Sequence, residues 1–93
     1  MSAEELATLR ARIDELDRAW IDVLARRFEA TRAVGRIKAA TASPARDPER
    51  ERQQRARTIA LAEETGVPPE LAMRVLDAIL ETVIREHVET GAS

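Results

Sequence analysis

A chain of 93 residues, 44% hydrophobic and 34% charged, is long enough for one small domain, whose single core is close to the minimum size for stability. The formal net charge of −2 disfavours nucleic acid as the main partner, because phosphate-binding domains usually carry a clear basic excess. Without cysteine there are no disulfides and no thiolate chemistry, and one histidine alone cannot form a zinc site. The first residues, MSAEELATLR, are acidic, and no run of about 18 apolar residues follows. We therefore expect no signal peptide, no membrane span and a cytoplasmic protein.

The first predicted element is a long amphipathic helix that covers about Glu4–Ala40 and begins near Ser2 or Ala3. Ser2 followed by Glu5 fits a capping box, and no proline or glycine precedes Gly35. Residues of one largely apolar stripe recur at steps of three and four: Leu6, Leu9, Ile13, Leu16, Trp20, Val23, Leu24, Thr31, Val34 and Ile37. A helix of about 35 residues is about 50 Å long, whereas a compact chain of this size has a radius of gyration of about 12 Å. The stripe extends beyond what the chain itself can cover, which predicts an oligomer.

Two cations interrupt this stripe. Arg27 falls where an apolar residue is expected, and Lys38 follows Ile37 at the end of the helix. A buried guanidinium without a partner is costly, so Arg27 needs either a glutamate or an anionic ligand. Trp20, in contrast, is most simply an anchor in the core or in a dimer interface. The long helix and its inward charges together suggest an oligomer that encloses an anion.

A break at Thr41–Asp47 separates this helix from a second one, predicted at Pro48–Thr65. Asp47 as N-cap and Pro48 at the first helical position favour a helix start, and Gly66 marks the end. The second helix has few large apolar residues, and its first two turns are almost wholly polar. We expect it to cover an edge of a helical bundle and to contribute little core.

A third helix is predicted after the turn Val67–Glu70 and extends to about Thr90, before Gly91. Its broad apolar face contains Leu71, Val75, Leu76, Ile79, Leu80, Val83 and Ile84. His87 lies four residues beyond Val83 and so extends the buried face. No β-branched run alternates with polar residues, and no internal repeat or domain boundary is visible. The predicted fold class is all-α, with three helices (long–short–medium) in a single domain of residues 1–93.

Few patterns in the chain could carry chemistry. There is no glycine-rich phosphate loop, and no serine has a histidine nearby in the sequence, which disfavours a nucleophilic triad. What remains is a set of charged residues on or near inward faces: Arg10, Arg27, Lys38, Arg46, Arg50, Asp47 and Glu51. Simpler explanations exist for some of them. Arg10 could be a surface charge, Lys38 could complement the C-terminus of its helix, and the RDPERE run could be solvated surface.

Four segments in order resemble the all-helical class of chorismate mutases: LRARIDELD, then RR, VGRIK and PARDPERE. The resemblance covers nearly the whole chain without gaps. It implies an intertwined homodimeric bundle in which the long first helix is shared between subunits. This agrees with the argument from helix length, which does not depend on the resemblance.

The resemblance implies that chorismate, a dicarboxylate with an enol-ether bridge, is rearranged to prephenate in one pericyclic step without a cofactor or metal. It further implies a set of substrate-binding residues, with Arg10 reaching into the site of the partner subunit: Arg10, Arg27, Lys38, Asp47, Arg50 and Glu51. Guanidinium groups bind carboxylates bidentately, which suits Arg10 and Arg27.

Other roles follow from the same resemblance. Lys38 would stabilise the negative charge that develops on the ether oxygen as the C–O bond breaks. Glu51, with the backbone near Asp47, would hold the ring hydroxyl, and Arg50 would order these acids or bind a carboxylate. The catalytic residues implied in this way are Lys38, Arg27 and His87.

The third helix departs from the family at two positions. The family often has a serine and, four residues later, a glutamine or glutamate that donates to the ether oxygen, and ungapped matching puts Val83 and His87 there. Val83 cannot hydrogen-bond a carboxylate, whereas His87 can donate a hydrogen bond as neutral imidazole or as imidazolium. A one-residue slip would instead place Thr82 and Glu86 at these positions, but this requires a deletion and turns both residues off the stripe.

The sequence therefore predicts a homodimeric chorismate mutase of aromatic amino-acid biosynthesis that needs no cofactor. An isochorismate-pyruvate lyase or an aminodeoxychorismate mutase on the same scaffold is the nearest alternative, because much the same cations could serve it. Retention of both Asp47 and Glu51 favours the hydroxyl-bearing substrate of the mutase. A non-catalytic dimerisation or regulatory module is the alternative from another class, and the departures at Val83 and His87 keep it open.

Overall fold

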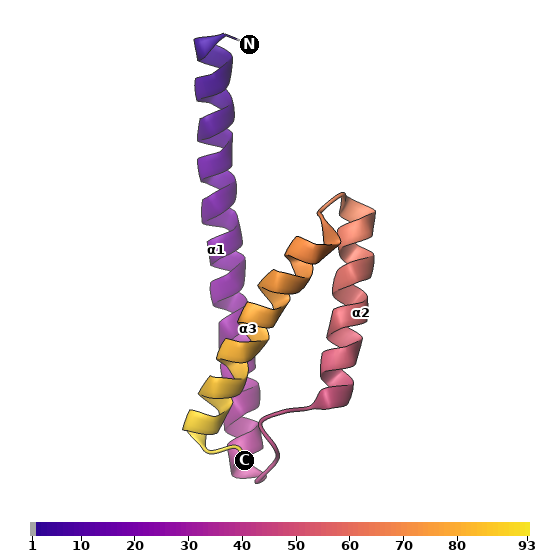
Figure 1. Cartoon of the computed structure of the whole chain (residues 1–93). Helices are drawn as coiled ribbons and strands as arrows, with labels where there is room; N and C mark the ends of the chain where they lie inside the picture. The colour runs from indigo at the N-terminus through magenta and orange to yellow at the C-terminus, as the bar shows by residue number, and fades with distance from the viewer. Residues whose placement is uncertain (1) are drawn as a thin grey trace. The chain divides into compact units, whose positions relative to one another are not determined.

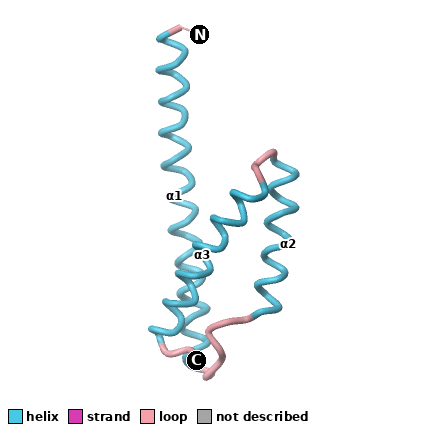
Figure 2. Tube along the Cα trace, in the orientation of Figure 1, coloured by secondary structure: helices cyan, strands magenta, loops and turns pink. Residues whose placement is uncertain are grey.

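The computed structural model of the chain describes residues 2–93. It contains three helices, α1 (Ala3–Ala40), α2 (Pro48–Thr65) and α3 (Pro69–Thr90), and the described residues form no strand (Figures 1 and 2). The predicted all-α class, the long–short–medium order and the bounds of α1 and α2 are confirmed, whereas α3 begins at Pro69, within the segment predicted as a turn. The chain divides into two units, of which the first ends at Thr31 and the second covers Arg32–Ser93.

The first unit consists of the N-terminal part of α1. Ser2 caps the helix, because its Oγ accepts a hydrogen bond of 3.1 Å from the backbone N–H of Glu5, as the sequence predicted. No residue from Ser2 to Thr31 is buried. Large apolar side chains that remain exposed include Leu6, Leu9, Ile13, Leu16, Trp20, Ile21 and Val23. The apolar stripe thus has the predicted helical spacing and remains uncovered.

The second unit holds the end of α1, the connecting loop, α2 and α3. Local signals fix its helix ends: Asp47 Oδ1 accepts from the N–H of Arg50 at 3.2 Å, and Pro48 occupies the first turn of α2. Gly66 ends α2 with a φ of 80°, in the left-handed region that glycine adopts most easily. A short turn then leads into α3, which packs against α2 (Figure 1).

The core of the second unit is small. Its buried residues are mostly apolar and include Ala45, Ala62, Leu76, Leu80, Val83 and Ala92. His87, which is 3% exposed, is the buried residue with an ionisable side chain in the described part of the chain. None of the described helices has an apolar stretch of the length that crossing a membrane requires.

Contacts far apart in the sequence join the end of α1 to α3. Arg32 donates two hydrogen bonds, of 3.2 and 3.1 Å, to the carboxylate of Glu86. One turn further along α1, Gly35 is buried against the ring of His87. The backbone N–H of Ala92 donates to the carbonyl oxygen of His87 at 2.9 Å and closes the end of α3. These contacts position the residues of the candidate site within the second unit.

Candidate functional site

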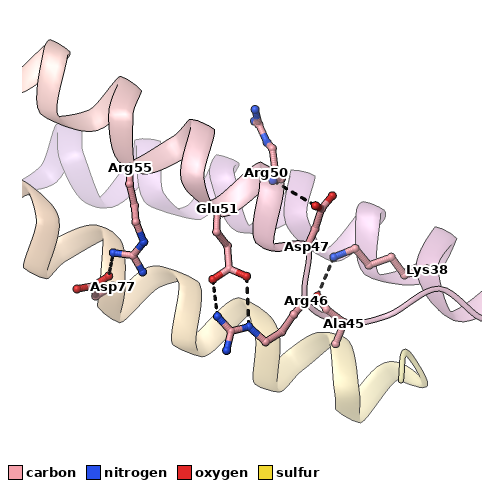
Figure 3. A network of polar contacts seen from close by, with 8 residues as sticks. All are labelled: Lys38, Ala45, Arg46, Asp47, Arg50, Glu51, Arg55 and Asp77. Atoms are coloured by element: carbon pink, nitrogen blue, oxygen red, sulfur yellow. Dashed lines mark hydrogen bonds and ion pairs between the residues drawn. The ribbon is translucent and has the colours of Figure 1, made fainter.

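Lys38 in the last turn of α1 is held at two points. Its Nζ donates to the carbonyl oxygen of Ala45 at 2.9 Å and lies 3.3 Å from Nδ1 of His87 (Figure 3 draws the Ala45 contact). An ammonium group has three N–H donors and no acceptor, so two of its three donors have protein acceptors. The family resemblance implied that Lys38 and His87 share one site, and the structure brings their side chains into contact.

The position of His87 depends on a glycine. A Cβ atom built on Gly35 would lie 2.7 Å from Cδ2 and 3.2 Å from Nε2 of the imidazole, closer than packed atoms approach. The ring therefore occupies the space that any other residue at position 35 would fill. Gly35 and Lys38 are three residues apart on α1 and share one face of the helix. The imidazole lies across this face, with its Cδ2–Nε2 edge on Gly35 and its Nδ1 beside Lys38.

The acidic residues of the site are fixed at the start of α2. Glu51 accepts two hydrogen bonds from the guanidinium of Arg46, of 2.7 and 3.3 Å, and its side chain is 12% exposed (Figure 3). The hydrogen bond from Arg46 holds the pKa of Glu51 below its usual value, although burial acts in the opposite direction. The same contact raises the pKa of Arg46. Glu51 is therefore a carboxylate with a partner already in place.

Arg50 differs from its expected role as an organiser of the acids. Its backbone N–H donates to the side chain of Asp47, but its guanidinium points away from Glu51 and Arg46 (Figure 3). The residue that orders Glu51 is Arg46, five residues earlier in the chain than Glu51. The side chain of Arg50 is exposed and remains available to a ligand carboxylate.

Val83 and His87 are both buried, one turn apart on α3. The one-residue alternative fits less well, because Glu86 is bound to Arg32, and Thr82 donates its hydroxyl to the carbonyl oxygen of Ala78 at 3.1 Å. The hydrogen bond from Arg32 lowers the pKa of Glu86, which keeps this side chain a carboxylate and not a donor. The geometry favours the ungapped match.

Arg10 and Arg27 lie on α1 in the first unit. Arg10 is exposed. Arg27 is partly buried, and its Nη1 is shielded from solvent without a hydrogen-bond partner among residues 2–93. From the sequence we expected either a glutamate or an anionic ligand beside Arg27. No glutamate partner of this nitrogen is observed among the described residues.

An open hollow of about 360 Å³ lies between α2 and α3 and is lined by Arg46, Glu51, Arg55, Asp77, Leu80, Glu81 and Ile84. Its volume suits a small molecule. Its two arginines are outnumbered by three acids, however, and both arginines are in ion pairs, Arg46 with Glu51 and Arg55 with Asp77 (Figure 3). The hollow therefore has little free positive charge to offer a dianion.

Three features of the site escaped the sequence argument. Gly35 was noted only as part of a motif, although a glycine inside an otherwise unbroken helix is a signal of close approach by another group. The carbonyl of Ala45 as an anchor for Lys38 had no signal in the sequence. The pairing of Arg46 with Glu51 could have been suspected from their spacing across the helix start. In the described part of the chain, no cluster of three or more histidines or acids is placed to hold a metal.

Comparison with known proteins gives concordant matches. Residues 9–88 match the family described as chorismate mutase type II. The chain is 40% identical over 82 residues to the T-protein of Enterobacter agglomerans, an alignment that covers 88% of this chain and 21% of that protein. It is 31% identical over 78 residues to the chorismate mutase of Methanocaldococcus jannaschii, over 84% of this chain and 79% of that protein. The chain thus spans about a fifth of the first relative and most of the second.

Proposed function

The chain belongs to the chorismate mutase type II family, and we propose that it catalyses the rearrangement of chorismate to prephenate in aromatic amino-acid biosynthesis. The observation that carries the proposal is the match over residues 9–88 together with Lys38, whose ammonium is fixed by Ala45 and His87. The reaction exchanges one C–O bond for one C–C bond within a single molecule. It requires no nucleophile, no proton transfer and no cofactor.

The protein can accelerate this reaction in two ways, by holding the substrate in the reactive conformation and by placing positive charge near the breaking bond. Folding the enolpyruvyl side chain over the ring brings the bond-forming carbons together. As the C–O bond breaks, negative charge develops on the ether oxygen, and a fixed cation stabilises this charge more in the transition state than in the ground state. Lys38 suits this role, because two of its donors are held by the protein and the third remains for the ether oxygen.

The substrate carboxylates need cations of their own. Arg27 is the proposed partner of one carboxylate, supported by its shielded Nη1 that lacks a hydrogen-bond partner among the described residues. Arg10, supplied by the other subunit, and Arg50 are proposed for the remaining anionic groups. Glu51 and the backbone near Asp47 are proposed to hold the ring hydroxyl. Both oxygens of Glu51 accept from Arg46, and each can accept a second hydrogen bond from the ring hydroxyl.

A homodimer completes this proposal. The apolar stripe of the first unit is the support, since Leu9, Ile13 and Trp20 are 48%, 54% and 55% exposed. Exposed apolar surface of this extent marks an interface, and a second copy of α1 offers a matching stripe. The intertwined arrangement explains why Arg10 is far along the helix from Lys38 and is still part of the proposed site. Cytoplasmic residence stays a prediction, to be tested by cell fractionation.

One experiment separates the proposed function from its alternatives. Purified protein is incubated separately with chorismate and with isochorismate, after dialysis against a chelator, and the products are identified. We expect prephenate from chorismate without added metal or nucleotide. Pyruvate formed from isochorismate at a much higher rate would identify a lyase. An amino-substituted substrate consumed in preference would identify an aminodeoxychorismate mutase. Consumption of none of these substrates would identify a binding or regulatory module.

A further inference from the structure

The buried histidine contacts the lysine that the proposed mechanism uses, and this contact restricts what the histidine can do. A lysine ammonium only donates hydrogen bonds, so Nδ1 of His87 must accept from Nζ at 3.3 Å. An imidazole that accepts at Nδ1 is neutral and carries its proton on Nε2. An imidazolium would instead direct an N–H at the ammonium and place two positive charges side by side.

We infer that His87 is a positioning residue for Lys38: its Nδ1 accepts from the ammonium and so aims the remaining N–H of Lys38 at the reacting ether oxygen. This role rests on the proposed function. It differs from direct donation to the substrate by the side chain at position 87, which the family resemblance alone would suggest.

The packing of the ring supports the inference. The Cδ2–Nε2 edge lies against Gly35, where a single added carbon would come within 2.7 Å of Cδ2. This edge is therefore pressed onto the backbone of α1, and the ring cannot rotate without losing that packing. With the ring fixed, Nδ1 has one position, and that position is beside Lys38. Ala45 then supplies the second acceptor, so the ammonium is held from two directions.

Charged groups on α1 and α3 interact with the ring. The cation in contact with it is Lys38, at the end of α1. The ion pairs of the second unit include Arg32–Glu86, Arg46–Glu51 and Arg55–Asp77. Of these carboxylates, Glu86 interacts electrostatically with His87, while both of its oxygens accept hydrogen bonds from Arg32.

The first test is spectroscopic and does not depend on activity. Because His87 is the single histidine of the chain, the imidazole nitrogen signals of untagged, ¹⁵N-labelled protein come from this residue alone. We expect the neutral tautomer with the proton on Nε2 at about pH 7, and we expect Lys38→Met to change the Nδ1 shift. An imidazolium, or a proton on Nδ1, would overturn the inference even if the enzyme proves to be a mutase.

The second test uses three substitutions that differ in where they place an acceptor. In His87→Asn, Oδ1 can take the place of Nδ1; in His87→Gln, the amide reaches toward the place of Nε2; His87→Leu offers no acceptor. We expect Asn to keep kcat within about threefold and Leu to lower it by roughly 10- to 100-fold with little change in KM, since Lys38 acts on charge that develops only in the transition state. Gln restoring activity where Asn fails, or Leu retaining full activity, would contradict the positioning role.

A third test is the pH dependence of kcat, for which the two roles of His87 predict different directions. If His87 donated as imidazolium, kcat would rise toward acid pH in the wild type and not in His87→Asn. A positioning role predicts a flat or falling kcat from about pH 8 to about pH 5. Wild-type protein that fails to convert chorismate would refute the proposed function, whereas the tautomer measurement would still decide the state of His87. Should His87→Leu not fold, the comparison of Asn with Gln remains decisive.

Discussion

Replacing Gly35 by alanine is the sharpest test of how the site is built. The added Cβ would meet Cδ2 of His87 at 2.7 Å and Nε2 at 3.2 Å. Carbon atoms in ordinary contact are about 3.5–4.0 Å apart, so the ring must withdraw by about 1 Å. The Nζ–Nδ1 contact, which is 3.3 Å in the wild type, would then exceed the range of a hydrogen bond.

Two opposing terms determine the stability of Gly35→Ala. Alanine is a better helix former than glycine by about 1 kcal/mol, whereas forcing extra volume into a packed site costs about 1–3 kcal/mol. The net effect is a loss of roughly 0–2 kcal/mol in the free energy of unfolding. The catalytic effect is larger, because a shift of about 1 Å in a catalytic group can cost up to about 100-fold in rate. We expect kcat to fall by roughly 10- to 100-fold.

The assay follows chorismate consumption by absorbance, alongside urea unfolding of the same preparations. Gly66→Ala is the matched control, because Gly66 has a φ of 80° and nothing within 4 Å of the added carbon. Its cost of about 1 kcal/mol is purely conformational and should leave kcat unchanged. Gly35→Ala in a His87→Ala background should regain stability, since the ring it collides with is gone.

The contrary result is easily recognised. If Gly35→Ala is about 1 kcal/mol more stable than the wild type and fully active, alanine has supplied only its helix propensity. The ring of His87 then does not lie against α1 at Gly35, and the contact between Nδ1 of His87 and Nζ of Lys38 is wrong as well.

Four other substitutions test the remaining claims. Arg27→Ala should lower kcat/KM by orders of magnitude and leave the circular dichroism spectrum unchanged. Nη1 of Arg27 has no hydrogen-bond partner among the described residues, so its removal leaves no protein group unpaired. An unfolded variant would show that Arg27 has a structural role. Trp20→Glu should halve the mass measured by light scattering, because it places a charge on the exposed apolar stripe. An unchanged mass would show that this stripe is not the dimer interface. Arg46→Ala should destabilise the protein at neutral pH and match the wild type in acid, as urea titrations can show. Val83→Ser should lower KM for chorismate by restoring a hydroxyl, at a cost in stability of about 1 kcal/mol for burying it; an unchanged KM would mean that position 83 does not face the substrate.

The sign of the Arg46 prediction follows from the pKa of its partner. Arg46 lowers the pKa of Glu51 in the folded state below the unfolded value. The stabilisation is therefore fully present above the unfolded pKa and is lost as the pH falls through the folded one. Wild type and Arg46→Ala should begin to converge as the pH falls through about 4.3, the ordinary pKa of a glutamate, and should coincide only below the lowered pKa of Glu51. A difference in stability that persists at lower pH would mean that Arg46 acts by packing.

Helix ends could be predicted from sequence because they depend on near neighbours. Asp47 caps α2 through the N–H three residues on, and Gly66 ends it through its own left-handed backbone. Both signals are complete within one turn of chain, so tertiary structure does not need to be known. The spacing of the α1 stripe was equally local, and its exposed side chains agree with the prediction that one chain cannot cover it.

Side-chain partners were harder to predict because they depend on which helix faces arrive together. Lys38 and His87 are 49 residues apart, and nothing in the sequence gives the 3.3 Å between their nitrogens. Assigning both to one site required the family resemblance. The resemblance gave Arg50 the ordering of the acids, a role that the structure associates with Arg46. These details depend on the register of the loop Thr41–Asp47, for which periodicity carries no information.

In the proposed homodimer, the interface and the active site both depend on α1. No residue from Ser2 to Thr31 is buried, and a helix without tertiary packing is only marginally stable in water. Covering the stripe with a second copy would stabilise α1 and, in the same step, deliver Arg10 to the partner's site. Catalysis should therefore depend on protein concentration near the dissociation constant of the dimer. A specific activity that stays constant on dilution into a range where light scattering shows monomers would separate the two and leave Arg10 without a role.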